Sequence, residues 1–327
     1  MRWNNTMNGV KPRTHRRTIS RFMLAMLLLA PTLLPQWSHA GPLRELWQAR
    51  RQAQSEEQEA RGGASKGQVL ENVAYGSSDQ ERLDIYLPHQ PHQAPLIVMV
   101  HGGGWRGGDK DSRSVVVNKI ERWVPRGLIF VTVNYPMLPD TSVLQQANYV
   151  ARALAYVEQH AAQWGGDSQQ IVLMGHSAGA HLSALIGADP GRFASLGLKP
   201  WLGTVLLDSA AMDVESIMSS RHLRLYDDAF GNDPGYWHEV SPILYLGHQA
   251  APFLAVCSSR RQTSCEEAER FASKAQQLQV SSSVLREDLS HRDINLQLGT
   301  EGDYTRTVER FMSGLSAGLA AALKVKS

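Results

Sequence analysis

Ser177 stands between two glycines in the pentapeptide Gly-His-Ser-Ala-Gly, residues 175–179. An apolar run with the character of a buried strand, residues 171–174, comes directly before it, and an apolar pattern of helical spacing begins directly after it. A serine in a G-x-S-x-G sequence between a strand and a helix is held in a tight, strained turn that exposes its hydroxyl group. The glycines fit this turn, because little room is left beside the serine. The pattern predicts that Ser177 is a nucleophile.

A second glycine-rich motif contains the kind of backbone that a serine nucleophile needs. His-Gly-Gly-Gly-Trp, residues 101–105, follows an apolar strand predicted over residues 96–100. Attack by a serine on an acyl carbon creates a tetrahedral oxyanion, which preorganised backbone N–H groups stabilise. We expect these groups at Gly103, Gly104 and Ala178. The alternatives are a flexible loop or a phosphate cradle, but this motif contains neither a G-x-G-x-x-G pattern nor a P-loop lysine.

The two motifs together resemble those of the α/β-hydrolase fold. The stretch HGGGWRGGDK, residues 101–110, and the stretch GHSAG some seventy residues later are most similar to one branch of that fold. This branch contains the carboxylesterases, the hormone-sensitive-lipase-like proteins and the kynurenine-formamidase-like proteins. The resemblance covers roughly residues 68–325. It implies a nucleophile, an acid and a histidine in that order along the chain, and no cofactor.

Among the twelve histidines, His291 has the position that the resemblance implies for a general base. It alone follows the last predicted strand, and we expect it in a loop before the final helix. His176 and His181 flank the serine too closely in sequence to face it as a base. His101 opens the glycine-rich loop and is expected to brace it. The alternative interpretation of His291 is an ordinary surface histidine in a polar loop.

The acid that would orient His291 is missing from its usual place. The family pattern puts it a few residues past the strand predicted over residues 253–257, where this chain has Ser-Ser-Arg-Arg-Gln-Thr. Two arginines there would disfavour an imidazolium if they pointed inward. Asp208 is favoured instead, because it ends an apolar strand, where an unpaired carboxylate is costly. Some α/β-hydrolases carry the acid after this strand.

Glu266 and Glu267 are the alternatives for the acid, since a bridge between Cys257 and Cys265 would bring them back toward His291. Two cysteines eight residues apart in an exported protein are expected to form a disulfide, and two free buried thiols are the alternative. No histidine or further cysteine lies near them in the sequence, so we expect no zinc site and no other metal.

Eight short stretches rich in β-branched and aliphatic residues alternate with stretches of helical spacing. This alternation predicts an α/β protein with a mostly parallel eight-stranded sheet and helices on both faces. Residues 211–250 break the alternation and form either a cap over a pocket or plain surface helices. The strands are expected over residues 69–74, 83–87, 96–100, 128–134, 171–174, 203–207, 253–257 and 282–286, and the helices over residues 143–163, 178–186, 266–278 and 304–323, the first of them capped by Thr141.

The first forty residues have the pattern of a removable export signal. Arginines precede the apolar stretch 22–34, and Ser-His-Ala at residues 38–40 offers small residues for cleavage. An uncleaved membrane anchor is the alternative, although the apolar stretch is short for a membrane span. We therefore expect a signal peptide over residues 1–40, a helical segment and linker over 41–67, and a catalytic domain over 68–327, located in the periplasm or outside the cell.

Charge excludes some classes of partner. The chain holds 33 basic and 31 acidic residues, and its first forty residues contain six basic and no acidic ones, so the rest has a net charge of −4. Nothing in that rest indicates binding to nucleic acid or to an anionic membrane. The sequence predicts a serine hydrolase that cleaves small carboxylic esters through an acyl-enzyme. An arylformamidase and a catalytically silent binding protein are the alternatives, and no oligomeric state follows from the sequence.

Overall fold

The computed structural model describes residues 67–324. The predicted signal peptide, residues 1–40, and nearly all of the predicted helical segment and linker, residues 41–67, lie outside these residues. No helix within residues 67–324 is long and apolar enough to cross a lipid bilayer.

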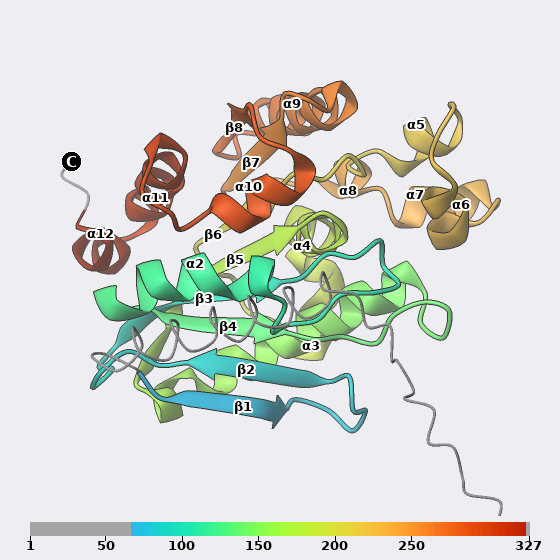
Figure 1. The fold of residues 1–327 in the computed structure, drawn as a ribbon. Helices are drawn as coiled ribbons and strands as arrows, with labels where there is room; N and C mark the ends of the chain where they lie inside the picture. The colour runs from blue at the N-terminus through green and yellow to red at the C-terminus, as the bar shows by residue number, and fades with distance from the viewer. Residues whose placement is uncertain (1–66, 325–327) are drawn as a thin grey trace, which may run out of the picture. The chain divides into compact units, whose positions relative to one another are not determined.

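An eight-stranded sheet forms the centre of the described chain (Figure 1). Its strands are β1 (Val69–Ala74), β2 (Arg82–Tyr86), β3 (Ala94–Val100), β4 (Ile129–Val133), β5 (Gly166–His176), β6 (Gly203–Leu207), β7 (Phe253–Ser258) and β8 (Ser282–Glu287). They are arranged in the order β1-β2-β4-β3-β5-β6-β7-β8. Strand β2 runs antiparallel to both of its neighbours, and all other neighbours pair in parallel. The predicted mostly parallel, eight-stranded sheet is confirmed.

Helices cover both faces of this sheet, as predicted. One face packs against α3 (Val143–His160), α4 (Ala178–Ala188) and α9 (Gln262–Gln277), and the other packs against α2 (Arg113–Trp123), α10 (His291–Gln297), α11 (Asp303–Leu315) and α12 (Ala317–Leu323). Because successive side chains of a strand point to opposite faces, Val98 enters the first core and Ile97 the second. All seven residues of β3 are buried, which explains its continuous apolar sequence.

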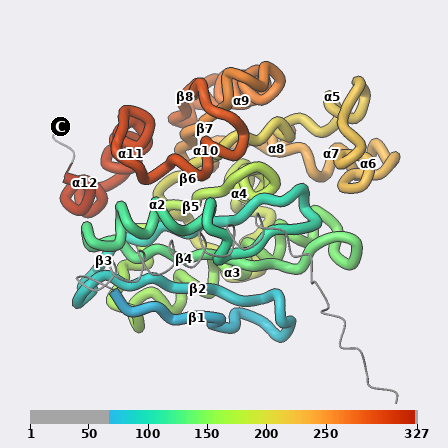
Figure 2. Tube along the Cα trace, in the orientation of Figure 1, coloured from blue at the N-terminus to red at the C-terminus, as the bar shows by residue number. Residues whose placement is uncertain are grey.

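The inserted segment, residues 211–250, contains four short helices between β6 and β7. They are α5 (Val214–Met218), α6 (Arg224–Phe230), α7 (Pro234–Glu239) and α8 (Pro242–Tyr245). Figure 2 shows α5, α6 and α7 grouped together beyond one end of the sheet. The ring of Phe230 is buried, with its centroid 4.9 Å from that of Trp105 in the glycine-rich loop. Phe230 of α6 therefore joins the inserted segment to the glycine-rich loop, whereas no residue of α7 is buried.

Three features of the helices differ from the predictions. Helix α3 is capped by Ser142 and not by Thr141, because Ser142 and Gln145 form a reciprocal capping box. The helix predicted over residues 304–323 is interrupted at Ser316, whose extended backbone separates α11 from α12. Helix α2 was not predicted, since its three consecutive valines are β-branched and lower its helix propensity.

Candidate active site

The turn that carries Ser177 joins β5 directly to α4. Ser177 has a φ of 55° and a ψ of −118°, a strained conformation for a residue with a side chain. A Cβ atom on Gly175 would lie 2.3 Å from the carbonyl oxygen of Gly179, and one on Gly179 would lie 2.3 Å from that of Val100. The two glycines are therefore required, because the turn approaches its own helix and β3 closely.

His291 faces this serine, although it lies 114 residues further along the chain. Its Nε2 lies 3.0 Å from the Oγ of Ser177. The expected loop position is wrong: His291 is the first residue of α10, a seven-residue helix capped by the hydroxyl of Ser290. The imidazole is 38% exposed, so a substrate can still approach it.

Two further histidines near the turn have supporting contacts. His176 donates from Nε2 to the carbonyl oxygen of His291 over 2.9 Å, and burial lowers the pKa of His176 to about 3. Burial also lowers the pKa of His181 to about 4. His181 accepts from Nε1 of Trp105 over 3.2 Å and donates to the carbonyl oxygen of Val240 over 2.8 Å. Both rings are therefore neutral near pH 7, and His181 links the glycine-rich loop to the inserted segment.

Asp208 is the third member of a line of contacting side chains. It directly follows β6 with a φ of 52°, and its Oδ2 lies 2.6 Å from the Nδ1 of His291. The carboxylate is fully buried. Burial alone would raise its pKa, but hydrogen bonds from His291 and two serines, together with the charge of Arg261, hold the pKa of this carboxyl well below its usual range. The structure therefore places the acid favoured from the sequence against His291.

The alternative acids, Glu266 and Glu267, do not reach His291. Glu266 is exposed on α9. Glu267 is buried, pairs with Arg270 and accepts the backbone N–H of Asp213 over 2.8 Å. The helix directs both carboxylates away from the imidazole, so this alternative is wrong.

The two arginines after β7 point in different directions. Arg260 pairs with the exposed Asp288. Arg261 points inward, and its Nη1 lies 2.5 Å from the Oδ2 of Asp208 and 2.7 Å from the Nδ1 of His291. The guanidinium therefore neutralises the buried carboxylate while lying beside the imidazole. Sequence reasoning missed this role; the available signal was that a buried Asp208 needs a partner.

The glycine-rich loop lies beside Ser177 in the same cavity. Gly103 has a φ of 130° and Gly104 a φ of 62°, both in the region that favours glycine. Gly103, Gly104 and Ala178 all line the cavity that contains Ser177. Within residues 67–324, no protein group accepts the backbone N–H of Gly103 or of Gly104. These N–H groups are therefore free to bind an anionic oxygen.

His101 braces this loop from behind, as expected. Its ring stacks on Tyr135 with centroids 4.6 Å apart, and the Tyr135 hydroxyl donates to the carbonyl oxygen of His101 over 2.9 Å. Burial lowers the pKa of His101, which keeps the ring neutral.

A cavity of about 570 Å³ contains the hydroxyl of Ser177 in its wall. Trp105 and three residues of the inserted segment, Leu223, Leu225 and Tyr226, form much of its apolar lining. Leu223 and Leu225 are exposed large apolar side chains. The volume suits a small molecule. Polar and charged lining residues include Asp109, Ser114, Arg261, Arg292 and Asn295.

Cys257 and Cys265 form a disulfide, with their Cα atoms 5.1 Å apart. The expected bridge is confirmed, and the alternative of two free thiols is wrong. Among residues 67–324, no group of three or more His, Cys, Asp or Glu side chains is arranged to hold a metal ion, and this includes the surroundings of the disulfide.

Comparison with known sequences finds relatives among hydrolases. The family model BD-FAE matches residues 83–195. The chain is 29% identical over 202 residues to Esterase LipQ of Mycobacterium tuberculosis. This alignment covers 57% of this chain and 47% of that protein. It is 29% identical over 186 residues to the kynurenine formamidase of Salmo salar. That alignment covers 57% of this chain and 60% of the formamidase. The chain spans less than two thirds of the length of either relative.

Comparison with solved structures finds the same architecture. A truncated form of a carbohydrate esterase from gut microbiota superposes with a TM-score of 0.66 and 17% sequence identity, covering 78% of this chain and 98% of that one. At this identity the likeness concerns the fold. The chain has the α/β-hydrolase fold and is related to esterases.

Proposed function

We propose that this protein is a serine hydrolase that cleaves carboxylic esters through Ser177, His291 and Asp208. One observation carries the proposal: the serine, on a strained turn in a cavity wall, lies 3.0 Å from an imidazole whose other nitrogen lies 2.6 Å from a buried carboxylate. A nucleophile, a base and a group that orients the base are the parts that acyl transfer requires. The similarity to esterases supports the same activity.

The reaction follows from the positions of these groups. Nε2 of His291 accepts the proton of Ser177 as Oγ attacks the acyl carbon, and the backbone N–H groups of Gly103, Gly104 and Ala178 stabilise the oxyanion. The imidazolium then gives the proton to the leaving alcohol, which departs and leaves an acyl-enzyme. Water repeats the sequence and releases the acid. Asp208 keeps the hydrogen on Nδ1, so that Nε2 is free to act as the base.

The cavity supports a small ester as the substrate. Leu223, Leu225 and Tyr226 offer apolar surface for an acyl or aryl group. His291 must contact the leaving oxygen, so the alcohol lies on the side of the cavity where α10 begins. Arg292 lines the cavity on that side.

We also propose that the protein is exported to the periplasm or beyond the cell. The basic and apolar pattern of residues 1–40 supports this location. The disulfide between Cys257 and Cys265 also supports it, because such bonds persist in oxidising compartments.

An arylformamidase is the second candidate, because one relative is a kynurenine formamidase. The same serine, base and oxyanion donors would cleave a formyl amide. The ester is favoured, because LipQ and the superposed carbohydrate esterase are both named as esterases. A catalytically silent binding protein would be favoured if no acid faced His291, but Oδ2 of Asp208 lies 2.6 Å from its Nδ1.

Turnover of 4-nitrophenyl butyrate and of formanilide tests these candidates. We expect Ser177-dependent hydrolysis of the ester at a kcat/KM well above that for formanilide. Ser177→Ala should lower kcat by at least about 10⁴-fold, because removal of the nucleophile leaves only binding and the oxyanion donors. Ester hydrolysis that persists in Ser177→Ala would refute the proposed mechanism, and a preference for formanilide would favour the amidase.

A further inference from the structure

Asp208 takes nearly all of its partners from one short segment of the chain. Its Oδ1 accepts the backbone N–H of Ser258 over 2.8 Å and the hydroxyl of Ser264 over 2.5 Å. Its Oδ2 accepts Nη1 of Arg261 over 2.5 Å and faces Nδ1 of His291 at 2.6 Å. Within residues 67–324, every hydrogen-bond partner of this carboxylate other than His291 therefore lies between residues 258 and 264.

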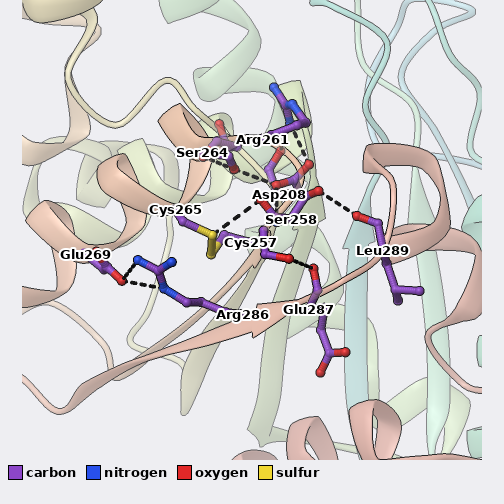
Figure 3. Close-up of a disulfide and its surroundings, with 12 residues drawn as sticks. Asp208, Cys257, Ser258, Arg261, Ser264, Cys265, Glu269, Arg286, Glu287 and Leu289 are labelled. Carbon is purple, nitrogen blue, oxygen red and sulfur yellow. Dashed lines mark hydrogen bonds and ion pairs between the residues drawn. A yellow bond between two sulfur atoms is a disulfide. The ribbon is translucent and has the colours of Figure 1, made fainter.

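A disulfide closes this segment at both ends. Cys257 belongs to β7 and Cys265 belongs to α9, so the bond encloses all three donors (Figure 3). Both cysteines are buried. A closed loop of this length has far fewer conformations than an open one. The bond therefore restricts the positions that the three donors can take.

The same segment also holds the chain that leads to His291. The hydroxyl of Ser258 donates to the carbonyl oxygen of Leu289 over 2.6 Å (Figure 3). The backbone N–H of Ser259 donates to the carbonyl oxygen of Glu287 over 2.9 Å. Leu289 lies two residues before His291. One disulfide-closed segment therefore contacts the acid on one side and the approach to the base on the other.

The use of the two carboxylate oxygens explains what this arrangement does. Because the two serines occupy Oδ1, the carboxylate cannot rotate without losing two hydrogen bonds, and Oδ2 stays directed at Nδ1 of His291. A hydrogen held on Nδ1 leaves Nε2 able to accept the proton of Ser177. We propose that the segment 257–265, closed by its disulfide, positions Asp208 and His291 relative to each other, with Ser264 as a positioning residue. This inference rests on the proposed function.

Two sets of substitutions test this positioning. Ser264→Ala removes one hydrogen bond to a charged oxygen without disfavouring the helix, so kcat for 4-nitrophenyl butyrate should fall about tenfold to a hundredfold while KM changes less than about threefold. Cys257→Ala combined with Cys265→Ala should lower kcat in the same direction. When all three substitutions are combined, kcat should fall by less than the product of the two separate fold-losses, because both sets of substitutions act on the contact between Asp208 and His291.

Ser282→Ala is the matched control. Its hydroxyl donates to the carbonyl oxygen of Ala272 in α9 over 2.9 Å, so this variant loses a hydrogen bond to the same helix but none to Asp208. We expect a wild-type kcat for it, with circular dichroism spectra confirming that each variant is folded. If the variant without cysteines fails to fold, the kcat of Ser264→Ala alone tests the positioning role.

The outcomes separate this inference from the proposed function. A wild-type kcat in Ser264→Ala, or an equal loss in Ser282→Ala, overturns the positioning role alone when the wild-type protein hydrolyses the ester through Ser177. Wild-type protein without Ser177-dependent hydrolysis contradicts the proposed function and this inference together.

Discussion

The nucleophile half of the site depends mainly on backbone groups, whereas the acid half depends mainly on side chains. The nucleophile half, residues 101–105 and 175–179, depends on backbone: positive φ angles, close approaches that exclude a Cβ atom, and free N–H groups. The acid half, Asp208 with His291 and the segment 257–265, depends mainly on side chains that come from three separate parts of the chain. Backbone of this kind requires glycines in a fixed local order, whereas a side-chain cluster can be assembled from distant positions.

The comparison predicts its largest effect at the centre of the acid half. Asp208→Asn keeps the shape of the side chain but removes the charge that holds the hydrogen on Nδ1 of His291. Nη1 of Arg261, 2.7 Å from Nδ1, can then donate to this nitrogen and place the hydrogen on Nε2. We expect kcat to fall about 10³- to 10⁴-fold in steady-state ester hydrolysis.

Arg261→Met provides the control for this explanation. With Asp208 present, the change should lower kcat because the buried carboxylate loses a donor. In the Asp208→Asn background the same change should raise kcat several-fold, because Met cannot donate to Nδ1. A loss of activity in both backgrounds would contradict the tautomer argument.

A smaller loss is expected when the backbone of the nucleophile half is disturbed. Gly103 has a φ of 130°, and a Cβ atom there would lie 1.9 Å from the carbonyl oxygen of Gly107, so Gly103→Ala must displace an oxyanion donor. We expect kcat to fall about 10²- to 10³-fold, the usual effect of losing one such donor. Gly127→Ala is the control: its φ is 91°, but no atom lies within 4 Å of the added Cβ. It should lower thermal stability and leave kcat near wild type, and equal kcat losses in the two variants would argue against the oxyanion role.

The smallest effect concerns a second buried carboxylate with fewer partners than Asp208. Glu158 accepts the backbone N–H of Lys199 over 3.0 Å, its Oε1 has no partner within residues 67–324, and burial raises its pKa to about 7. A carboxyl whose pKa is raised on folding contributes stability below its unfolded pKa, near 4.5, and loses it as the pH rises through 7.

Glu158→Gln removes this dependence. The variant should be more stable than the wild type at pH 8 by about 1–2 kcal/mol after allowance for solvent screening, with the difference disappearing toward pH 4. Urea unfolding at both pH values measures this. A stability difference that is the same at pH 4 and pH 8 would contradict the raised pKa of Glu158. It would also contradict the argument that the number of hydrogen-bond partners sets the pKa of a buried carboxylate.

The same division explains what could be predicted from the sequence. Gly175, Ser177 and Gly179 form a contiguous pattern, because the geometry of the turn is local, and the alternation of strands with helices predicts the sheet. Asp208 could be favoured over the glutamates, because a charge at the end of a buried strand needs partners. The identity of those partners could not be predicted.

Arg261 illustrates why. From the sequence it is a positive charge at the wrong place beside a base, and only the approach of β6 to the start of α9 makes it a partner of the acid. The short helix α10 was not predicted for a related reason. Its seven residues are too few for a clear pattern, and it is held by tertiary contacts, such as the donation from Nζ of Lys119 to the carbonyl oxygen of Asn295 over 2.6 Å.

Covalent labelling tests most directly whether Ser177 is activated by His291 and Asp208. A fluorophosphonate reacts with an activated serine, and mass spectrometry of the digested protein identifies the modified residue. We predict one adduct per chain, on Ser177, formed much more slowly in Asp208→Asn. An unlabelled wild-type protein, or an adduct on another residue that persists in Ser177→Ala, would contradict this account.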